Sequence, residues 1–482
     1  MSAKPLRPRR GMTPRVGRLR PRGSPADQHP LRAVSLAAML LAALLGAGAA
    51  RAQADAMPHT PRQIEIDRGL SELEASCVAC HAREEPGKVH DWSLSIHARA
   101  NVTCLDCHAA LLTDKDAAEC PGTMPHRNIK ISPVVTPRDC SRCHPREAAQ
   151  FDLSKHARTW EIQTAELKDP WLKGMNSPVE RSTGCYVCHG SDISSGVLTT
   201  ENWPNSGCGR LNPDGSKGAC VICHTTHRFS IAEARKPETC GQCHLGPDHP
   251  QDEIYFESKH GKRYLAEGES WNFEVAPDAW EPGAHFTAPT CAACHMAGLG
   301  GLATSHDVGE RLKWETQAAL TVLNKDHDGN AEREKMLQVC TQCHSPRWAG
   351  NYLARLDETV VHYNDAYYRP IKAIMDDLYA KSILTAWPVF DEEIEWAFYE
   401  FWHHEGRRAR MGAMMMGPDY AWWHGFYDLK RTYQHIVELA EQARAAGHGS
   451  ATFVPGAGGP NLTTAPVAPL PQAWDQVKEL RG

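Results

Sequence analysis

Three stretches after residue 345 carry apolar side chains at the spacing of an α-helix, with apolar residues three, four or seven positions apart. The stripes are Ile371, Ile374, Met375, Leu378 and Tyr379; Ile394, Ala397, Phe398, Phe401 and Trp402; and Phe426, Leu429, Tyr433, Ile436 and Ala440. Pro370 is well placed to start the first helix, and Pro388 and Pro418 separate the three stretches. We therefore expect a long-helix bundle over residues 346–446.

The chain before this region has a different pattern. Segments such as 207–215 are rich in Gly, Asn, Pro and Asp, which favour turns. We expect residues 55–345 to form short helices and turns. The stretch 447–482 is rich in Gly, Ala and Pro, and it is expected to be a flexible tail.

Residues 1–54 have the pattern of a secretory signal. Ten Lys and Arg residues accompany an apolar run at 33–50, and small residues at 52–54 suit cleavage near Ala54. A membrane anchor is the alternative reading. Met12 is an alternative start. Cleavage would change the formal net charge from −6 to −15, because the segment holds ten basic residues and one acid. We expect export to the periplasm and a basic electron-carrier protein, or a quinone-linked cytochrome, as redox partner.

Sixteen of the 18 cysteines fall into eight copies of Cys-x-x-Cys-His. The copies are Cys77/Cys80/His81, Cys104/Cys107/His108, Cys140/Cys143/His144, Cys185/Cys188/His189, Cys220/Cys223/His224, Cys240/Cys243/His244, Cys291/Cys294/His295 and Cys340/Cys343/His344. This pattern is typical of covalent c-type haem attachment, in which two thiols bond the porphyrin and the adjacent His ligates iron. Zinc ribbons and dithiol redox motifs need no such His. The cofactor prediction is eight c-type haems.

The haems would form much of the core of residues 55–345, because eight of them leave roughly 54 residues each in the mature chain. The predicted fold class is mainly α: a haem-packed multihaem cytochrome c domain followed by the long-helix bundle.

Further histidines are candidates for the second axial ligand of each iron. A short phrase, Ser-x-His followed by Ala or Gly, occurs at His97, His156 and His260, and a looser form occurs at His306. The full set of candidates is His97, His126, His156, His227, His260 and His306. Seventeen histidines outside the motifs follow the signal segment, and seven second ligands would leave ten of them spare. The sequence therefore also permits eight bis-His haems, that is, an electron-transfer cytochrome without catalysis. A conductive haem polymer is a third class.

Two weaker signals remain open. Cys120 and Cys208 lie outside the motifs, and they are read either as a disulfide or as two buried thiols. Residues 324–332 space oxygen ligands like the first part of a calcium loop, but Lys335 stands where the closing Glu belongs. Calcium at this loop is a further cofactor expectation.

The number and order of motifs, followed by a helical region, resemble the octahaem hydroxylamine oxidoreductase family. Three phrases add to the resemblance, namely residues 203–220, 246–250 and 417–425. The resemblance implies that the fourth haem, on Cys185, Cys188 and His189, is catalytic. It also implies a distal Asp-His pair, for which Asp248 and His249 are the match. His249 would exchange protons near the bound nitrogen, and Asp248 would orient it or act as a base.

Oxidative members of that family carry a tyrosine of a neighbouring subunit bonded to the catalytic porphyrin. Tyr420 is the candidate for this bond, with Tyr427 behind it. The resemblance implies a homo-oligomer, a trimer in the family. It also implies interconversion of hydroxylamine with NO or nitrite, or reduction of nitrite or hydroxylamine to ammonia. The direction stays open.

Overall fold

The computed structural model describes residues 70–120, 129–166, 177–203, 207–386 and 389–451. The predicted signal segment and residues 452–482 of the predicted tail lie outside these ranges. All described residues belong to one compact unit, Glu65–Gly482.

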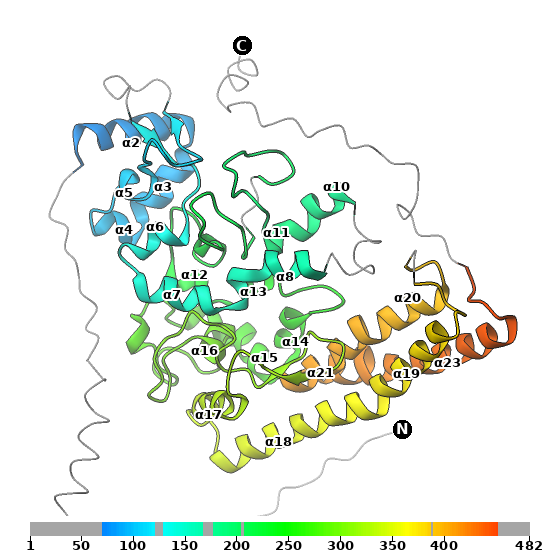
Figure 1. Cartoon of the computed structure of the whole chain (residues 1–482). Helices are drawn as coiled ribbons and strands as arrows, with labels where there is room; N and C mark the ends of the chain where they lie inside the picture. The colour runs from blue at the N-terminus through cyan, green and yellow to red at the C-terminus, as the bar shows by residue number, and fades with distance from the viewer. Residues whose placement is uncertain (1–69, 121–128, 167–176, 204–206, 387–388, 452–482) are drawn as a thin grey trace, which may run out of the picture. The chain divides into compact units, whose positions relative to one another are not determined.

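The region that holds the Cys-x-x-Cys-His motifs consists of short helices and turns, as expected. Its helices are α2 (Glu72–Glu84), α3 (Pro86–Leu94), α4 (Ile96–Arg99), α5 (Cys104–His108), α6 (Pro137–Ser141), α7 (Pro145–Leu153), η1 (Lys155–Arg158), α8 (Thr159–Glu166), α10 (Pro178–Glu180), η2 (Arg181–Cys185), α11 (Tyr186–His189), η3 (Cys220–Ile222), α12 (Ile231–Arg235), α13 (Pro237–Gly241), α14 (Gln251–Glu257), α15 (Lys259–Glu267), η4 (Gly268–Ser270), η5 (Pro277–Ala279), α16 (Cys291–His295) and α17 (Gly329–Cys340) (Figure 1).

Strand structure among the described residues is confined to two small antiparallel pairs and a few isolated bridges. They are β1 (Ala118–Glu119) with β2 (Lys130–Ile131), and β3 (Trp314–Glu315) with β4 (Val322–Leu323). Ala118 lies opposite Ile131, and Trp314 lies opposite Leu323. The fold is therefore mainly α, and the prediction of fold class is confirmed.

The second region contains longer helical runs. Its elements are α18 (Pro346–His362), η6 (Tyr363–Tyr368), α19 (Arg369–Ala380), α20 (Glu393–Tyr399), η7 (Glu400–Glu405), α21 (Gly406–Met414), α22 (Pro418–Ala421), η8 (Trp422–Tyr427) and α23 (Asp428–Ala446). The segments η6, η7 and η8 are π-helical, and each joins two α-helices into one run. Helix α23 packs on α19 and α20, and α18 contacts α21.

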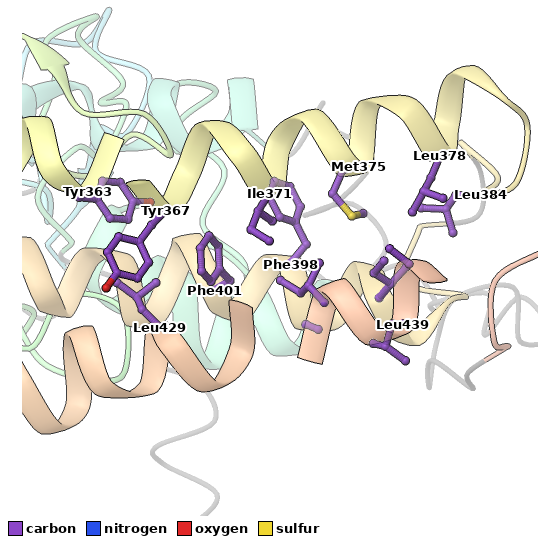
Figure 2. Close-up of a cluster of buried hydrophobic side chains, with 14 of the residues drawn as sticks. Tyr363, Tyr367, Ile371, Met375, Leu378, Leu384, Phe398, Phe401, Leu429 and Leu439 are labelled. Carbon is purple, nitrogen blue, oxygen red and sulfur yellow. The ribbon is translucent and has the colours of Figure 1, made fainter. Parts of the chain in front are cut away.

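The predicted stripes form the core of this bundle. Ile371, Met375 and Leu378 of α19 face Phe398 and other side chains of α20 and α23 (Figure 2). The remaining stripe residues are either buried in the same cluster or packed against it. Apolar burial on one face of each helix thus holds the bundle together.

One helix boundary differs from the prediction. Pro370 lies in the first turn of α19, but the chain does not leave the helix before it, because η6 continues directly from α18. A π-turn is wider than an α-turn, so it gives room for the proline ring, which would clash with a carbonyl one α-turn earlier. Pro418 lies between two helices as expected, since α21 ends at Met414 and α22 begins at Pro418, and Pro388 lies outside the described residues.

Within the described residues, no helix combines the length and the apolar character that a membrane crossing requires.

Candidate functional site

The histidine of each Cys-x-x-Cys-His motif lies in a helical turn or directly after one. In α5 and α16 the whole motif is helical, and the threonine before it caps the helix. Thr103 and Thr290 are these caps, and both are at most 3% exposed. A capped turn fixes the two thiols on one side and carries the histidine at its end.

The second thiol of two motifs lies at the surface of the chain. Cys143 and Cys343 are exposed, whereas the other fourteen motif cysteines are half-buried. Both thiols lie in a turn between two helices. Cys143 follows the end of α6 and precedes α7, and Cys343 lies between α17 and α18. His144, beside Cys143, is exposed as well.

The exposure of Cys143 places one edge of the third motif toward solvent. Its partner thiol, Cys140, is half-buried. Haem attachment through Cys143 and Cys343 stays a prediction.

Five motif histidines each lie opposite a second histidine. The pairs, with the distance between ring centres, are His144 and His97 (6.2 Å), His108 and His227 (6.3 Å), His244 and His156 (5.9 Å), His224 and His306 (6.4 Å), and His344 and His260 (6.1 Å). Each second histidine is one of the predicted ligands. Every pair joins residues that are distant in sequence.

These separations fit a haem iron between the two rings. With metal–nitrogen bonds of about 2 Å on either side, two axial imidazoles place their ring centres about 6 Å apart. Neutral imidazole is the ligand form, and burial lowers the pKa of several of these histidines, to about 4 for His156 and His224. The donor set therefore suits bis-His haem, and ligation itself stays a prediction.

The repeated Ser-x-His phrase has a structural reason. Ser95, Ser154 and Ser258 are helix N-caps, and their hydroxyls accept hydrogen bonds from backbone N–H groups of the following turn. All three serines are at most 2% exposed. The histidine is thus the second residue of a capped turn, which gives its ring a fixed direction.

Cysteines of different motifs also interact. Cys140 lies against Cys220, Cys188 against Cys243, and Cys240 against Cys291. Similar but longer-range interactions join the first motif to the second, the second to the third, the fifth to the sixth and the seventh to the eighth. The motifs therefore follow the spatial order 1–2–3–5–6–7–8, and the fourth branches from the sixth.

The fourth motif has different surroundings. The electrostatic neighbours of His189 are His249, Asp248 and His244. Burial, followed by His249, lowers the pKa of His189, and Asp248 opposes this shift. Within the described residues, no histidine ring lies opposite His189 at the distance seen in the five pairs. The predicted Asp-His pair lies near this motif instead.

Asp248 and His249 lie in a tight turn between the sixth motif and α14. Gly246 has a φ of 95°, which favours glycine, and Pro247 and Pro250 restrict the backbone on either side. The Nε2 atom of His249 is 3.6 Å from Oδ1 of Asp248. The ring of His249 is 6.3 Å from that of His244, so it borders both the fourth and the sixth motif.

Two residues of the helical region complete the cluster, and neither was predicted from the sequence. Arg407 of α21 donates from Nη1 to Oδ2 of Asp248 at 3.1 Å, and from Nε to the carbonyl of Gln317 at 2.8 Å. His403 of η7 places Nε2 3.9 Å from the same Oδ2. Because Asp248 and Arg407 are 159 positions apart, no local spacing could have indicated this contact.

The cluster is half-buried to buried and rich in titratable groups. The side chains of Asp248 and Arg407 are 20% and 10% exposed. Burial, with help from Arg407, lowers the pKa of His403 to about 2, so this ring is neutral at physiological pH. The Nδ1 atoms of His189, His249 and His403 are buried without a hydrogen-bond partner. Such atoms are suited to a bound group or water.

The chain matches the family described as "Seven times multi-haem cytochrome CxxCH" over residues 100–388. It belongs to this family of multihaem cytochromes. The matched range contains the second to the eighth motif, and the family implies covalently bound c-type haems.

One relative found by sequence and two solved structures are similar to this multihaem cytochrome. A probable nitrite reductase-hydroxylamine oxidoreductase fusion protein of Kuenenia stuttgartiensis is 27% identical over 328 residues, which are 58% of this chain and 35% of that protein. The chain therefore spans about a third of this relative. Among solved structures, a hypothetical multiheme protein matches with a TM-score of 0.67, at 25% identity, over 79% of this chain and 97% of the other. A Kuenenia stuttgartiensis reducing HAO-like protein complex matches with a TM-score of 0.58, at 23% identity, over 77% and 85%.

Other predicted residues of the cytochrome have different neighbours or lie outside the described ranges. His126 belongs to the undescribed residues 121–128, and neither His81 nor His295 has a histidine ring opposite it among the described ones. Tyr420 is part of α22, where its backbone N–H bonds to Glu257 at 3.2 Å and its ring stacks on His424. Its role in a bond from a neighbouring subunit stays a prediction.

The two cysteines outside the motifs lie near different partners. Cys120 interacts with Cys77, whereas Cys208 lies among Cys188, Cys223 and Cys240. Burial raises the pKa of the Cys208 thiol to about 12. This arrangement favours the reading without a disulfide.

The predicted calcium loop is used for other contacts. The Asp328 side chain caps α17, and Lys335 forms ion pairs with Glu332 at 3.1 Å and Glu310 at 2.8 Å. Calcium binding at this loop stays a prediction.

Proposed function

We propose that the protein is an oxidoreductase of small nitrogen compounds, with its reaction site at the haem held by Cys185, Cys188 and His189. The observation that carries this proposal is the difference between the motifs. Five motif histidines face an imidazole that suits a second axial ligand, whereas His189 lies near the Asp248, His249, His403 and Arg407 cluster.

A bound haem would supply an iron that takes a nitrogen ligand and exchanges electrons. The residues of the cluster supply the rest. Asp248 accepts the hydrogen bond of Arg407 and lies beside His249, so it holds both groups in place. His249 is placed to give or take protons, because an imidazole ring carries nitrogens that can donate and accept.

Arg407 and His403 favour an anionic substrate. Asp248 compensates part of the charge of this guanidinium, but a guanidinium carries five N–H donors and can bond to a carboxylate and an oxyanion together through charge-assisted hydrogen bonds. His403 is neutral, so its ring can hydrogen-bond to a substrate without placing a second positive charge beside Arg407. Nitrite is anionic, whereas hydroxylamine is neutral. We therefore infer that nitrite is a substrate or product of this site, with hydroxylamine, NO and ammonia as the related species.

The remaining motifs would transfer electrons. Because the fourth motif contacts the sixth, electrons would enter or leave the reaction site along the 1–2–3–5–6–7–8 series. An exported protein in a homo-oligomer, with an electron-carrier protein as partner, fits this role. One of the solved structures with a similar fold is described as a complex, which is compatible with a protein partner.

The experiment that tests the proposal combines spectroscopy with turnover. We expect the reduced holoprotein to show one high-spin haem among low-spin haems, and to reduce nitrite or hydroxylamine, or to oxidise hydroxylamine. A porphyrin bond to Tyr420, detected by mass spectrometry of the Cys185 peptide, would indicate that the protein works in the direction of hydroxylamine oxidation. Only low-spin haems and no turnover in either direction would instead establish a bis-His electron-transfer cytochrome.

A further inference from the structure

Three acidic side chains meet at one end of the helical region, far in sequence from the haem motifs. Asp391, Glu392 and Glu395 lie where the chain enters α20, and one carboxylate oxygen from each comes within 4.8 Å of the others. Glu392 is 6% exposed and Glu395 is fully buried.

Neighbouring segments surround this acidic cluster. Glu393 N–H bonds to the carbonyl of Ser450 at 2.9 Å, and Glu392 forms a bridge with Ala451. The segment that follows α23 therefore runs along the cluster. On the other side, the hydroxyl of Tyr379 on α19 donates to Oε1 of Glu395. The cluster thus joins α19, α20 and the end of α23.

The charges of the cluster are not balanced by basic groups. Within the described part of the chain, no Lys, Arg or His forms an ion pair with Asp391, Glu392 or Glu395 (the ion pair of Glu393 with His435 is separate). The Oε2 atoms of Glu392 and Glu395 are buried without a hydrogen-bond partner. A buried carboxylate with no compensating charge is costly, so the cluster needs either a cation or protons.

We propose that Asp391, Glu392 and Glu395 bind one calcium ion. All donors at the cluster are oxygens, which suit a hard cation rather than zinc or copper. Thr385 adds a hydroxyl, since its Oγ1 lies 3.1 Å from Oδ2 of Asp391, and its N–H already bonds to Oε1 of Glu392 at 3.1 Å. Waters would complete the six to eight ligands that calcium takes.

The ion would stabilise the end of the helical region by cross-linking its segments. It would link the loop after α19 to the first turn of α20, and through Glu392 to the segment after α23. Calcium would then raise the thermal stability of the protein without changing the haem sites.

Shared protons are the competing explanation. Burial, followed by Asp391, raises the pKa of Glu392 to about 8, and burial raises the pKa of Glu395 as well. Protons held in this way would stabilise the fold below the ordinary carboxyl pKa, and this stability would be lost as the pH rises through about 8. With calcium present, the stability of the fold would instead rise with pH, because calcium binds the deprotonated carboxylates more tightly than the protonated ones.

The test uses the mature holoprotein, stripped with a chelator and titrated with calcium chloride at pH 8 by calorimetry. We expect one equivalent to bind through the cluster and the melting temperature to rise by about 2–5 °C. Asp391→Asn should abolish both the binding of this equivalent of calcium and the rise in melting temperature. Glu395→Gln is the second variant, in case the first fails to fold. Asp326→Asn, in the predicted loop of residues 324–332, is the matched control and should leave both unchanged.

Two results would overturn the proposal. One is an unaltered protein that binds no calcium and simply loses stability between pH 6 and pH 9. The other is bound calcium that is lost in Asp326→Asn and kept in Asp391→Asn, which would place the ion at residues 324–332.

Discussion

Arg407 is the residue with the sharpest expected effect on the reaction. It is 10% exposed and bonds to Asp248 at 3.1 Å, beside the fourth motif. If it binds the anionic substrate, Arg407→Gln should raise the KM for nitrite roughly 10- to 100-fold, since hydrogen bonds to charged groups contribute about 1.5–3 kcal/mol. The KM for hydroxylamine should change much less. Steady-state kinetics with both substrates would measure the difference.

Two variants control this experiment. Arg407→Lys keeps the charge and should recover part of the affinity for nitrite, although it loses the fork geometry of the guanidinium. Arg408→Gln removes the neighbouring arginine, which lies 3.7 Å from Asp428, and should leave both KM values unchanged. Equal losses for nitrite and hydroxylamine in Arg407→Gln would mean that Arg407 only positions Asp248.

Local sequence predicted part of these sites and could not predict the rest. The Ser-x-His phrase identified His97, His156 and His260 because an N-cap and the residue two positions later form one local unit. Arg407 and His403 join Asp248 only through the packing of α21 and η7 against a distant turn. Nothing in the sequence around them distinguishes them from surface residues of a helix.

At the scale of elements, close contact of α21 and α22 depends on glycine. A Cβ atom on Gly412 would lie 2.6 Å from the carbonyl carbon of Tyr420 and 2.9 Å from Cα of Ala421. These are backbone atoms, so the helices would have to move apart. We expect Gly412→Ala to lower the free energy of unfolding by about 1–3 kcal/mol. Thermal or denaturant unfolding would measure this loss.

Gly350 of α18 provides the matched control. No atom lies within 4 Å of a Cβ placed there. Since alanine favours the helix over glycine, Gly350→Ala should be neutral or stabilising by up to about 1 kcal/mol. A Gly412→Ala variant as stable as Gly350→Ala would show that α21 and α22 pack less closely than described.

The predicted helices differ from the observed ones mainly at the π-segments. Apolar periodicity located the cores of α19, α20 and α23, because burial of one face repeats with each turn. A π-turn adds one residue to a helical turn and leaves no such repeat in the sequence. The segments η6 and η7 were therefore not predictable, although η7 carries His403 of the site.

At the scale of the whole molecule, the number of haems is open to a direct test. The family match begins at residue 100 and contains seven motifs, so the first motif lies outside it. The structure nevertheless joins that motif to the others. Glu74 of α2 accepts a hydrogen bond from Thr103, the cap of α5, in a buried contact, and Cys77 interacts with Cys104. Helix α2 is thus part of the same packed unit.

We therefore expect the mature protein to carry eight covalent haems, counted by intact mass spectrometry after export. Replacing Cys77 and Cys80 by serine should remove the mass of one haem and leave seven, because each motif binds its haem through its own two thiols. Cys120→Ser is the control and should keep all eight, although Cys120 lies near Cys77. Seven haems on the unaltered protein would mean that the first motif packs in the fold without serving as an attachment site.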